Sequence, residues 1–372
     1  MLKGIHLTLL IGPAVPVPVS KEVLDALTAV EVTTATEDPS VFRLEFKLSP
    51  RSPLHTVFLL SGGAPIPMIR VIIIATVNAM PEVLMDGVMT NHEVRPGADG
   101  GPAILSIIGE DLSRVMDYID FSGIPYPAMP AEARVVMILA KYAVLGIVPM
   151  VIPSIFMDVP LPTSRIPRQW GKDLPYIKYL ASAVGYTFYV DPGPAPGMSI
   201  AYWGPEIRIG VPQPALNVDM DAHTNVESLS FNYDSDAKAM PILWITKKVP
   251  IPIPVPDISL LKPPLGLVRP IPKKFYQITG LAKLSPTQAA AAGMAEASKT
   301  ADVVTGSGSL DVLRYGRILK SRKLVGVRGA GTAFDGLYYV NKVKHRIKRG
   351  EYKQDFELSR SGLISTLPRV PA

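Results

Sequence analysis

The chain has 372 residues, a formal net charge of +6, 38 prolines and no cysteine. A chain of this length exceeds a single hydrophobic core, so we expect two or more domains. The high proline content argues against long helices and favours strands, turns and extended connections. The absence of cysteine excludes disulfides, thiolate metal sites and cysteine nucleophiles.

Residues 1–120 predict a first small β-barrel. The apolar Leu2 to Val19 predicts a first strand and not a signal peptide, because its prolines interrupt any helical segment. Only Ser20 to Leu27 has a helical pattern. Short runs between Gly and Pro turns are typical of barrel strands, and we expect them at Val41 to Leu48, Val57 to Leu60, Ile69 to Val77, Glu82 to Val94 and Ala103 to Ile108.

Residues 121–205 predict a helical connector. Ala131 to Leu145 and Leu174 to Val184 have the apolar spacing of helices. The second of these ends at Gly185, and glycine is typical of helix C-termini. The connector therefore separates two strand-rich regions.

The segment from Val135 to Met157 is apolar and long enough to span a bilayer. Lys141 opposes a membrane position, and Pro149 and Pro153 break a helix. We therefore predict a core helix that ends near Gly146 and no membrane insertion, with a transmembrane segment as the alternative.

A second barrel is expected over residues 206–246 and again over 306–362, followed by a tail at 363–372. The insertion at 247–305 is a Pro-rich arm followed by an Ala-rich helix. Prolines at alternating positions favour extended backbone and exclude a central strand. The helix over Ala289 to Lys299 has little apolar bulk, so we expect it on the surface or against a neighbouring subunit.

The Pro-rich arm also supplies the only candidate site residues. Its apolar side chains alternate with prolines and would be exposed, which favours a contact with another subunit or an accessory protein. A stiff surface loop is the equal alternative. The candidate interface residues are Ile251, Ile253, Val255, Leu260, Leu261 and Leu265.

The region from Phe334 to Arg360 predicts a β-hairpin with a two-residue turn at Arg349-Gly350. Both arms alternate between apolar and charged residues, the period of a half-buried strand. A two-residue turn fixes the register. It places Ile347 opposite Tyr352, Val343 opposite Phe356, Lys344 opposite Asp355 and Lys342 opposite Glu357.

The sequence offers no pattern of catalytic, cofactor or metal chemistry. The five histidines lack metal-ligand spacing, and His345 falls on the inward face of the hairpin, where a hydrogen-bonded core histidine is expected. The glycine runs lack the P-loop and dinucleotide signatures. The carboxylate pairs Asp117 with Asp120 and Asp234 with Asp236 have no cleft assigned to them. We therefore predict no enzyme, no cofactor and no small-molecule substrate.

Basic residues crowd the last barrel. We interpret them as a solvated strand face, because they alternate with apolar residues and two of them face carboxylates. An acidic protein partner and nucleic acid are the alternatives. The residues are Arg314, Arg317, Lys320, Arg322, Lys323, Arg328, Lys342, Lys344, Arg346, Lys348, Arg349 and Lys353.

Four segments together resemble the late control D family of contractile-tail proteins, which build baseplate hubs. The last barrel carries the most specific motifs, which are Phe334-Asp-Gly-Leu-Tyr-Tyr-Val340, Val343-Lys-His345 and Gly350 to Leu358. Three earlier segments follow in the order of the family. They are Val83 to Arg114, Trp170 to Val190 and Leu216 to Phe231.

The resemblance implies a mainly β chain with a helical connector and two related small barrels, assembled as a trimeric ring. It implies a structural hub that joins the inner tube to a separate spike protein, among other baseplate components. VgrG-type spike proteins carry a comparable hub region. The resemblance also implies assembly in the cytoplasm into a virion or tail-like particle, with extracellular release as one fate. A nucleic-acid or anionic-surface binding protein that uses the basic last barrel is the alternative function.

Overall fold

The structure is a computed structural model. It describes residues 4–13, 15–48, 68–97, 101–154, 159–160, 163, 166–245, 251–254, 262–278, 286–299 and 302–367. The strand expected at Val57 to Leu60 lies outside these residues. No helix in the described part of the chain is long and apolar enough to cross a membrane.

The N-terminal unit is an antiparallel sheet. Its strands lie in the order β3-β4-β7-β6-β5-β1. A 3-10 turn over Leu112–Asp117 directly follows β7. The predicted strands over residues 41–48, 69–77, 82–94 and 103–108 are confirmed with small shifts at their ends. The elements are β1 (Ile5–Gly12), β2 (Val17–Pro18), α1 (Lys21–Ala26), β3 (Leu27–Ala35), β4 (Val41–Leu48), β5 (Arg70–Val77), β6 (Met80–Arg95) and β7 (Ala103–Asp111).

The connector combines two helices with a three-stranded sheet. The predicted first helix is shorter than expected, because it ends at Ala140 and a 3-10 turn over Ala143–Leu145 follows. Gly146 then turns the chain with a φ of 76°. A Cβ there would lie 2.1 Å from the carbonyl oxygen of Gly197, so only glycine fits. The elements are α2 (Ala131–Ala140), β8 (Ile147–Val151), α3 (Asp173–Ser182), β9 (Thr187–Pro192) and β10 (Ser199–Gly204).

The second unit repeats the strand order of the first. Its strands lie in the order β12-β17-β20-β19-β18-β11, and the hairpin register predicted around the Arg349-Gly350 turn is confirmed at all four pairs. Gly350 has a φ of 85°, in the left-handed region that glycine adopts readily. The elements are β11 (Gln213–Asn217), β12 (Ser228–Tyr233), β17 (Val304–Asp311), α5 (Val312–Tyr315), β18 (Leu324–Arg328), β19 (Gly336–Lys348) and β20 (Glu351–Arg360).

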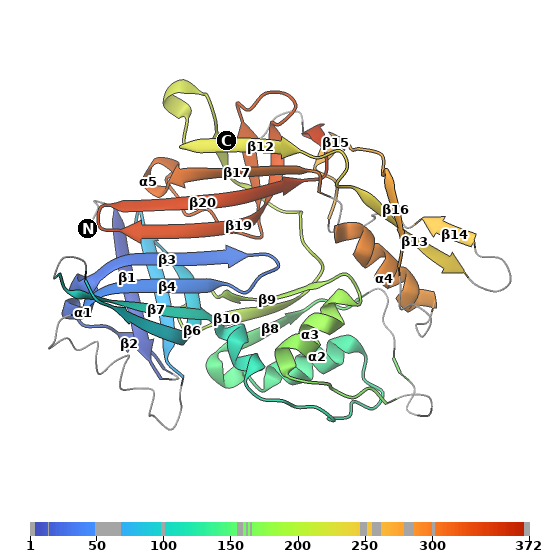
Figure 1. The fold of residues 1–372 in the computed structure, drawn as a ribbon, viewed down its shortest axis with the longest axis horizontal. Helices are drawn as coiled ribbons and strands as arrows, with labels where there is room; N and C mark the ends of the chain where they lie inside the picture. The colour runs from blue at the N-terminus through green and yellow to red at the C-terminus, as the bar shows by residue number, and fades with distance from the viewer. Residues whose placement is uncertain are drawn as a thin grey trace.

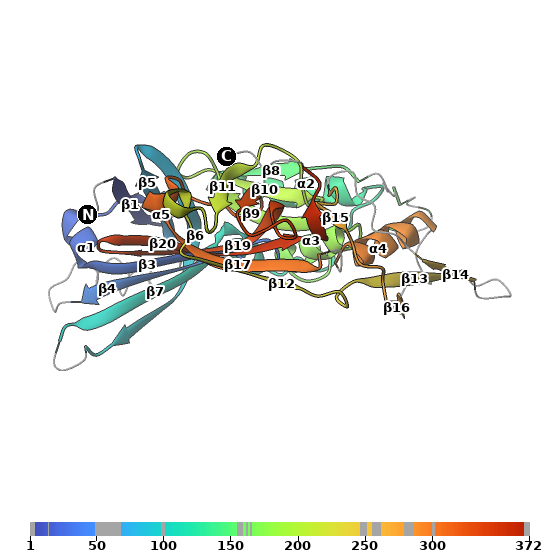
Figure 2. The same cartoon turned by 90° about the horizontal axis from the view of Figure 1, so that it is seen from above.

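The insertion forms an arm that extends from one end of the molecule, as both views show (Figures 1 and 2). β14 is an edge strand paired with β13, a position that tolerates proline. The Ala-rich helix α4 is partly buried within the chain, since Ala295 and Ala297 are buried and Ala295 lies against Gly185. The elements are β13 (Ala239–Ile245), β14 (Ile251–Pro254), β15 (Gly266–Val268), β16 (Lys274–Gln277), α4 (Pro286–Lys299) and β21 (Leu363–Ser365).

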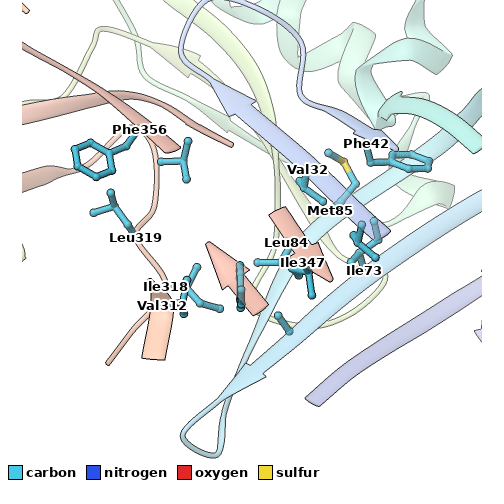
Figure 3. Packing of buried hydrophobic residues seen from close by; sticks show 14 of the residues in the cluster. Val32, Phe42, Ile73, Leu84, Met85, Val312, Ile318, Leu319, Ile347 and Phe356 are labelled. Carbon is cyan, nitrogen blue, oxygen red and sulfur yellow. The ribbon is translucent and has the colours of Figure 1, made fainter. Parts of the chain in front are cut away.

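One hydrophobic core runs through both units. Figure 3 shows residues of this core, with Val32, Phe42 and Ile73 from the first unit and Ile347 and Phe356 from the second. Burial of each such side chain stabilises the fold by roughly 1.5 to 3 kcal/mol. The two units therefore share one core, to which side chains of both contribute. The prediction of a mainly β chain with a helical connector is confirmed, and the two predicted barrels stay a prediction.

Candidate functional site

The two units are joined by pairing of β3 with β19, which we call the closed junction. The strands are antiparallel, with Ala35 opposite Lys342 and Ala29 opposite Lys348. β3 thus lies between β4 and β19, and the sheet continues from one unit into the other (Figure 1). The sequence analysis did not predict β3, although its alternating Val and Thr residues are the signal of a strand.

Both long strands change partner at a bulge. The first part of β19 pairs with β18, and after the bulge between Val340 and Lys342 the rest pairs with β3. β6 behaves in the same way: its first part pairs with β5, and a bulge separates Met89 from Asn91. Beyond that bulge β6 pairs with β7 alone among the described residues. The second half of β6 therefore has an open edge among the described residues, whereas the second half of β19 uses the equivalent edge to pair with β3.

β12 holds the position in the second unit that β3 holds in the first. It pairs only with β17 among the described residues, so its other edge is open. Because the amide of Asp234 donates to the carbonyl of Val303 and the ladder alternates, the amides of Leu229 and Phe231 point to the open edge. The open edges of β12 and of the second half of β6 are the candidate site.

Two buried arginines fix the units to the connector. Arg70 donates two hydrogen bonds of 2.7 Å to Asp86 and one of 3.1 Å to the carbonyl of Gly197. Arg322 binds the carboxylate of Asp191 and the carbonyl of Ala35. Charged groups as deeply buried as these are costly unless paired, so each arginine holds its two segments in one arrangement.

The buried titratable groups have structural partners. The Nδ1 atom of His345 lies 2.8 Å from the hydroxyl of Tyr352, and burial lowers the pKa of His345 to about 3. This confirms the predicted core histidine. The carboxylate of Asp111 accepts the amides of Ser40 at 2.7 Å and Ser113 at 2.9 Å, and burial raises its pKa. These contacts support strand ends and the core.

The surface carboxylate pairs are likewise occupied by local contacts. Asp120 accepts the amide of Ser122, and Asp236 accepts from Lys273 at 2.6 Å. Within the described residues no group of His, Asp and Glu is placed to hold a metal ion.

The basic strand face of the second unit is largely paired with carboxylates. Such exposed pairs each contribute at most about 1 kcal/mol, but they reduce the charge that β19 and β20 offer for phosphate binding. This favours the interpretation as a solvated face. The pairs are Lys342 with Glu357 at 3.4 Å, Lys344 with Glu31 at 3.1 Å, Arg346 with Asp355 at 2.6 Å and Lys353 with Glu227 at 2.9 Å.

The predicted interface residues do not gather at one place that the structure describes. Ile251 and Ile253 lie on the edge strand β14. Val255, Leu260 and Leu261 lie outside the described residues. Leu265 is only 4% exposed, because it packs against residues of β18 and β19 within the same chain.

Neither a protein-family model nor a curated protein matches the sequence. Among solved structures, a tail protein from Neisseria meningitidis is similar over 97% of this chain and 98% of its own, with a TM-score of 0.63 at 13% identity. A 43 kDa tail protein of prophage MuSo2 from Shewanella oneidensis is similar over 96% of this chain and 98% of its own, with a TM-score of 0.62 at 12% identity.

The chain has the fold of phage tail proteins. A chain of the Francisella PdpA–VgrG complex is also similar, with a TM-score of 0.62 at 10% identity over 100% of this chain and 55% of that one. The resemblance to VgrG-like baseplate hubs found in the sequence is therefore confirmed at the level of the fold. Each unit of this tail-protein fold has the same strand order, and the closed junction and the open edges occupy equivalent positions in it.

Proposed function

We propose that the protein is a structural hub of a contractile tail or injection system. In this proposal three copies close into a ring that joins an inner tube to a separate spike protein. The likeness of the fold to tail proteins and to a chain of the PdpA–VgrG complex supports a role of this kind. The hub acts mechanically, through subunit contacts and without bond chemistry. It assembles in the cytoplasm with other baseplate components into a virion or tail-like particle.

The repeated strand order is the observation that carries the proposal. Because all the strands from β12 to β6 alternate in direction, the two open edges run opposite ways. Antiparallel strands can therefore pair across copies, with β12 of one copy beside β6 of the next. Such heterologous contacts generate a ring when the rotation closes. Three copies would then present six similar units to a sixfold tube.

The test is the mass of the purified chain in solution, alone and mixed with the tube and spike proteins encoded beside it. We expect a mass of three chains, either alone or on the spike. Leu229→Pro removes an amide from the open edge of β12 and leaves the ladder to β17 intact, so we expect self-association to weaken at least about tenfold. Leu229→Ala, which keeps the amide, is the matched control and should associate as the wild type does.

A stable monomer that ignores both partners would contradict the hub proposal. Binding to unrelated DNA that weakens steeply with salt would then favour the alternative of a nucleic-acid or anionic-surface binding protein.

A further inference from the structure

The end of the Pro-rich arm returns to the second unit as a two-stranded ribbon. β15 pairs with β21, with Gly266 opposite Ser365 and Val268 opposite Leu363. Leu267 and Ile364 therefore lie opposite each other, and their side chains are 64% and 44% exposed. We call Leu267 and Ile364 the ribbon surface; Val268, at the next position of β15, and Leu367, beyond the end of β21, are also exposed.

The ribbon is held rigidly on the second unit. A Cβ on Gly266 would lie 2.3 Å from the carbonyl oxygen of Gly362, so the two backbones cross at a distance that only glycine permits. Leu265 anchors one strand, because its side chain is buried and its amide donates to the hydroxyl of Ser361 at 3.1 Å. The amide of Ile364 donates to the carbonyl of Ala333 at 3.1 Å and anchors the other. The backbone that carries the exposed side chains is thus held in place.

Ile364 has a backbone conformation that isoleucine rarely adopts. Its φ is 60°, in the left-handed region where a β-branched side chain is strained. An asparagine or glycine would fit this position without strain. The chain therefore has a strained backbone and an exposed apolar side chain at the same residue. A residue that served only to make the turn would need neither.

The arm beside the ribbon surface is basic as well as apolar. Residues 262–278 contain four cations and no carboxylate. The same segment has two further exposed apolar residues, Ile271 at 83% and Phe275 at 58% exposed. Lys262 is paired with Glu206 at 2.9 Å and Lys273 with Asp236 at 2.6 Å, whereas Arg269 and Lys274 have no carboxylate within ion-pair distance among the described residues. A partner suited to this surface carries apolar side chains set among carboxylates.

We infer that the ribbon surface and the adjacent basic arm form a docking site for a second protein whose surface is apolar and acidic. This inference rests on the proposed function, because the proteins expected to adjoin the hub are the inner tube and the spike. A preformed, rigid apolar patch with peripheral charge is typical of interface cores with polar rims. The partner thus differs from a second copy of this chain, whose contacts we assign to the open edges.

The test uses the full chain, with the tube and spike proteins encoded beside it as probes. Ile364→Asn removes the apolar side chain and relieves the strain, and Leu267→Ser removes its neighbour. Val144→Ser is the control, because Val144 is a fully solvated apolar residue on the connector. Binding is measured by sedimentation and by calorimetry at low and at raised salt. The melting temperature of each variant is measured alongside.

We expect one of the two probes to bind, and Ile364→Asn and Leu267→Ser each to weaken that binding at least about tenfold. Raised salt should weaken it further. The melting temperature of Ile364→Asn should equal or exceed that of the wild type, so that lost binding cannot be assigned to misfolding. Val144→Ser should change affinity less than about twofold.

Binding of a probe that both ribbon variants leave unchanged would overturn the inference and leave the hub proposal intact. Variants that break self-association but not probe binding would overturn it in favour of a contact between copies. Failure of both probes to bind the wild type would also overturn it. The mass of the chain alone, as a trimer or a monomer, would then show separately whether the hub proposal stands.

Discussion

The closed junction and the open edges occupy equivalent positions in the two units. Only at the closed junction do the strands find hydrogen-bonding partners on both sides within one chain, among the described residues. At the closed junction β3 has a partner on both sides, and the core beneath it is buried. At the open edges β12 and the second half of β6 each have one partner among the described residues. The comparison teaches that a strand position paired on both sides in one unit can keep an unpaired edge in its repeat, among the described residues.

Proline substitution gives the largest expected difference in the free energy of unfolding between the closed junction and the open edge of β12. Val32 is buried and pairs with His345 on one side and Phe42 on the other. Val32→Pro removes a ladder hydrogen bond from a central strand, so we expect it to lower the free energy of unfolding by at least about 3 kcal/mol. Leu229→Pro at the open edge should lower it by less than about 1 kcal/mol. Urea unfolding measures both, and equal losses would contradict the comparison.

Acid should weaken the closed junction through His345. Burial lowers the pKa of His345 to about 3, whereas an unfolded histidine titrates near 6.5. Between these values the unfolded chain binds more protons, so the free energy of unfolding falls as the pH falls, by up to about 1.4 kcal/mol per pH unit.

The measurement is urea unfolding at pH 7 and pH 5 for the wild type and for His345→Gln. The glutamine retains a polar group beside Tyr352 and does not titrate. The variant should lose less stability between the two pH values. Parallel losses in both proteins would assign the acid sensitivity to carboxylates instead.

The ion pair across the closed junction should have the smallest effect. Lys344 lies 3.1 Å from Glu31, and both side chains are more than one third exposed. Lys344→Ala should therefore cost less than about 1 kcal/mol. A double-mutant cycle with Glu31→Ala, repeated in 1 M salt, should show the coupling disappear because salt screens it. A coupling that survives salt would indicate a desolvated pair.

The alternation of residue types and the turn residues predicted those elements whose structure depends on neighbouring residues alone. Four pairs of the hairpin from β19 to β20 were predicted in register, because a two-residue turn and period-two alternation leave one solution near the turn, whereas the bulge between Val340 and Lys342 was not predicted. The connector helices were predicted, but the first ends at Ala140, before the turn at Gly146, whose close neighbour Gly197 lies about fifty residues further along the chain. Such a contact leaves no local signal.

Long-range pairing explains most of what the sequence did not predict. β3 and β19 lie about 300 residues apart, and nothing near Val32 specifies His345 as its partner. The ribbon was missed because β15 and β21 have three residues each, too few to show a period. Leu265 was expected at an interface since it follows prolines, yet the ribbon brings it against Leu324 and Leu337. The left-handed backbone of Ile364 contradicts its residue type.

The partner exchange along β19 also has a consequence for load. β19 is hydrogen-bonded to β20 along one side, and to β18 and then β3 along the other. A pull along its axis therefore loads three ladders in shear at once, whereas a pull across the sheet would peel their bonds one after another. Tension applied along this strand is shared between both units. The strand cannot be pulled out of the sheet without breaking the core that the two units share.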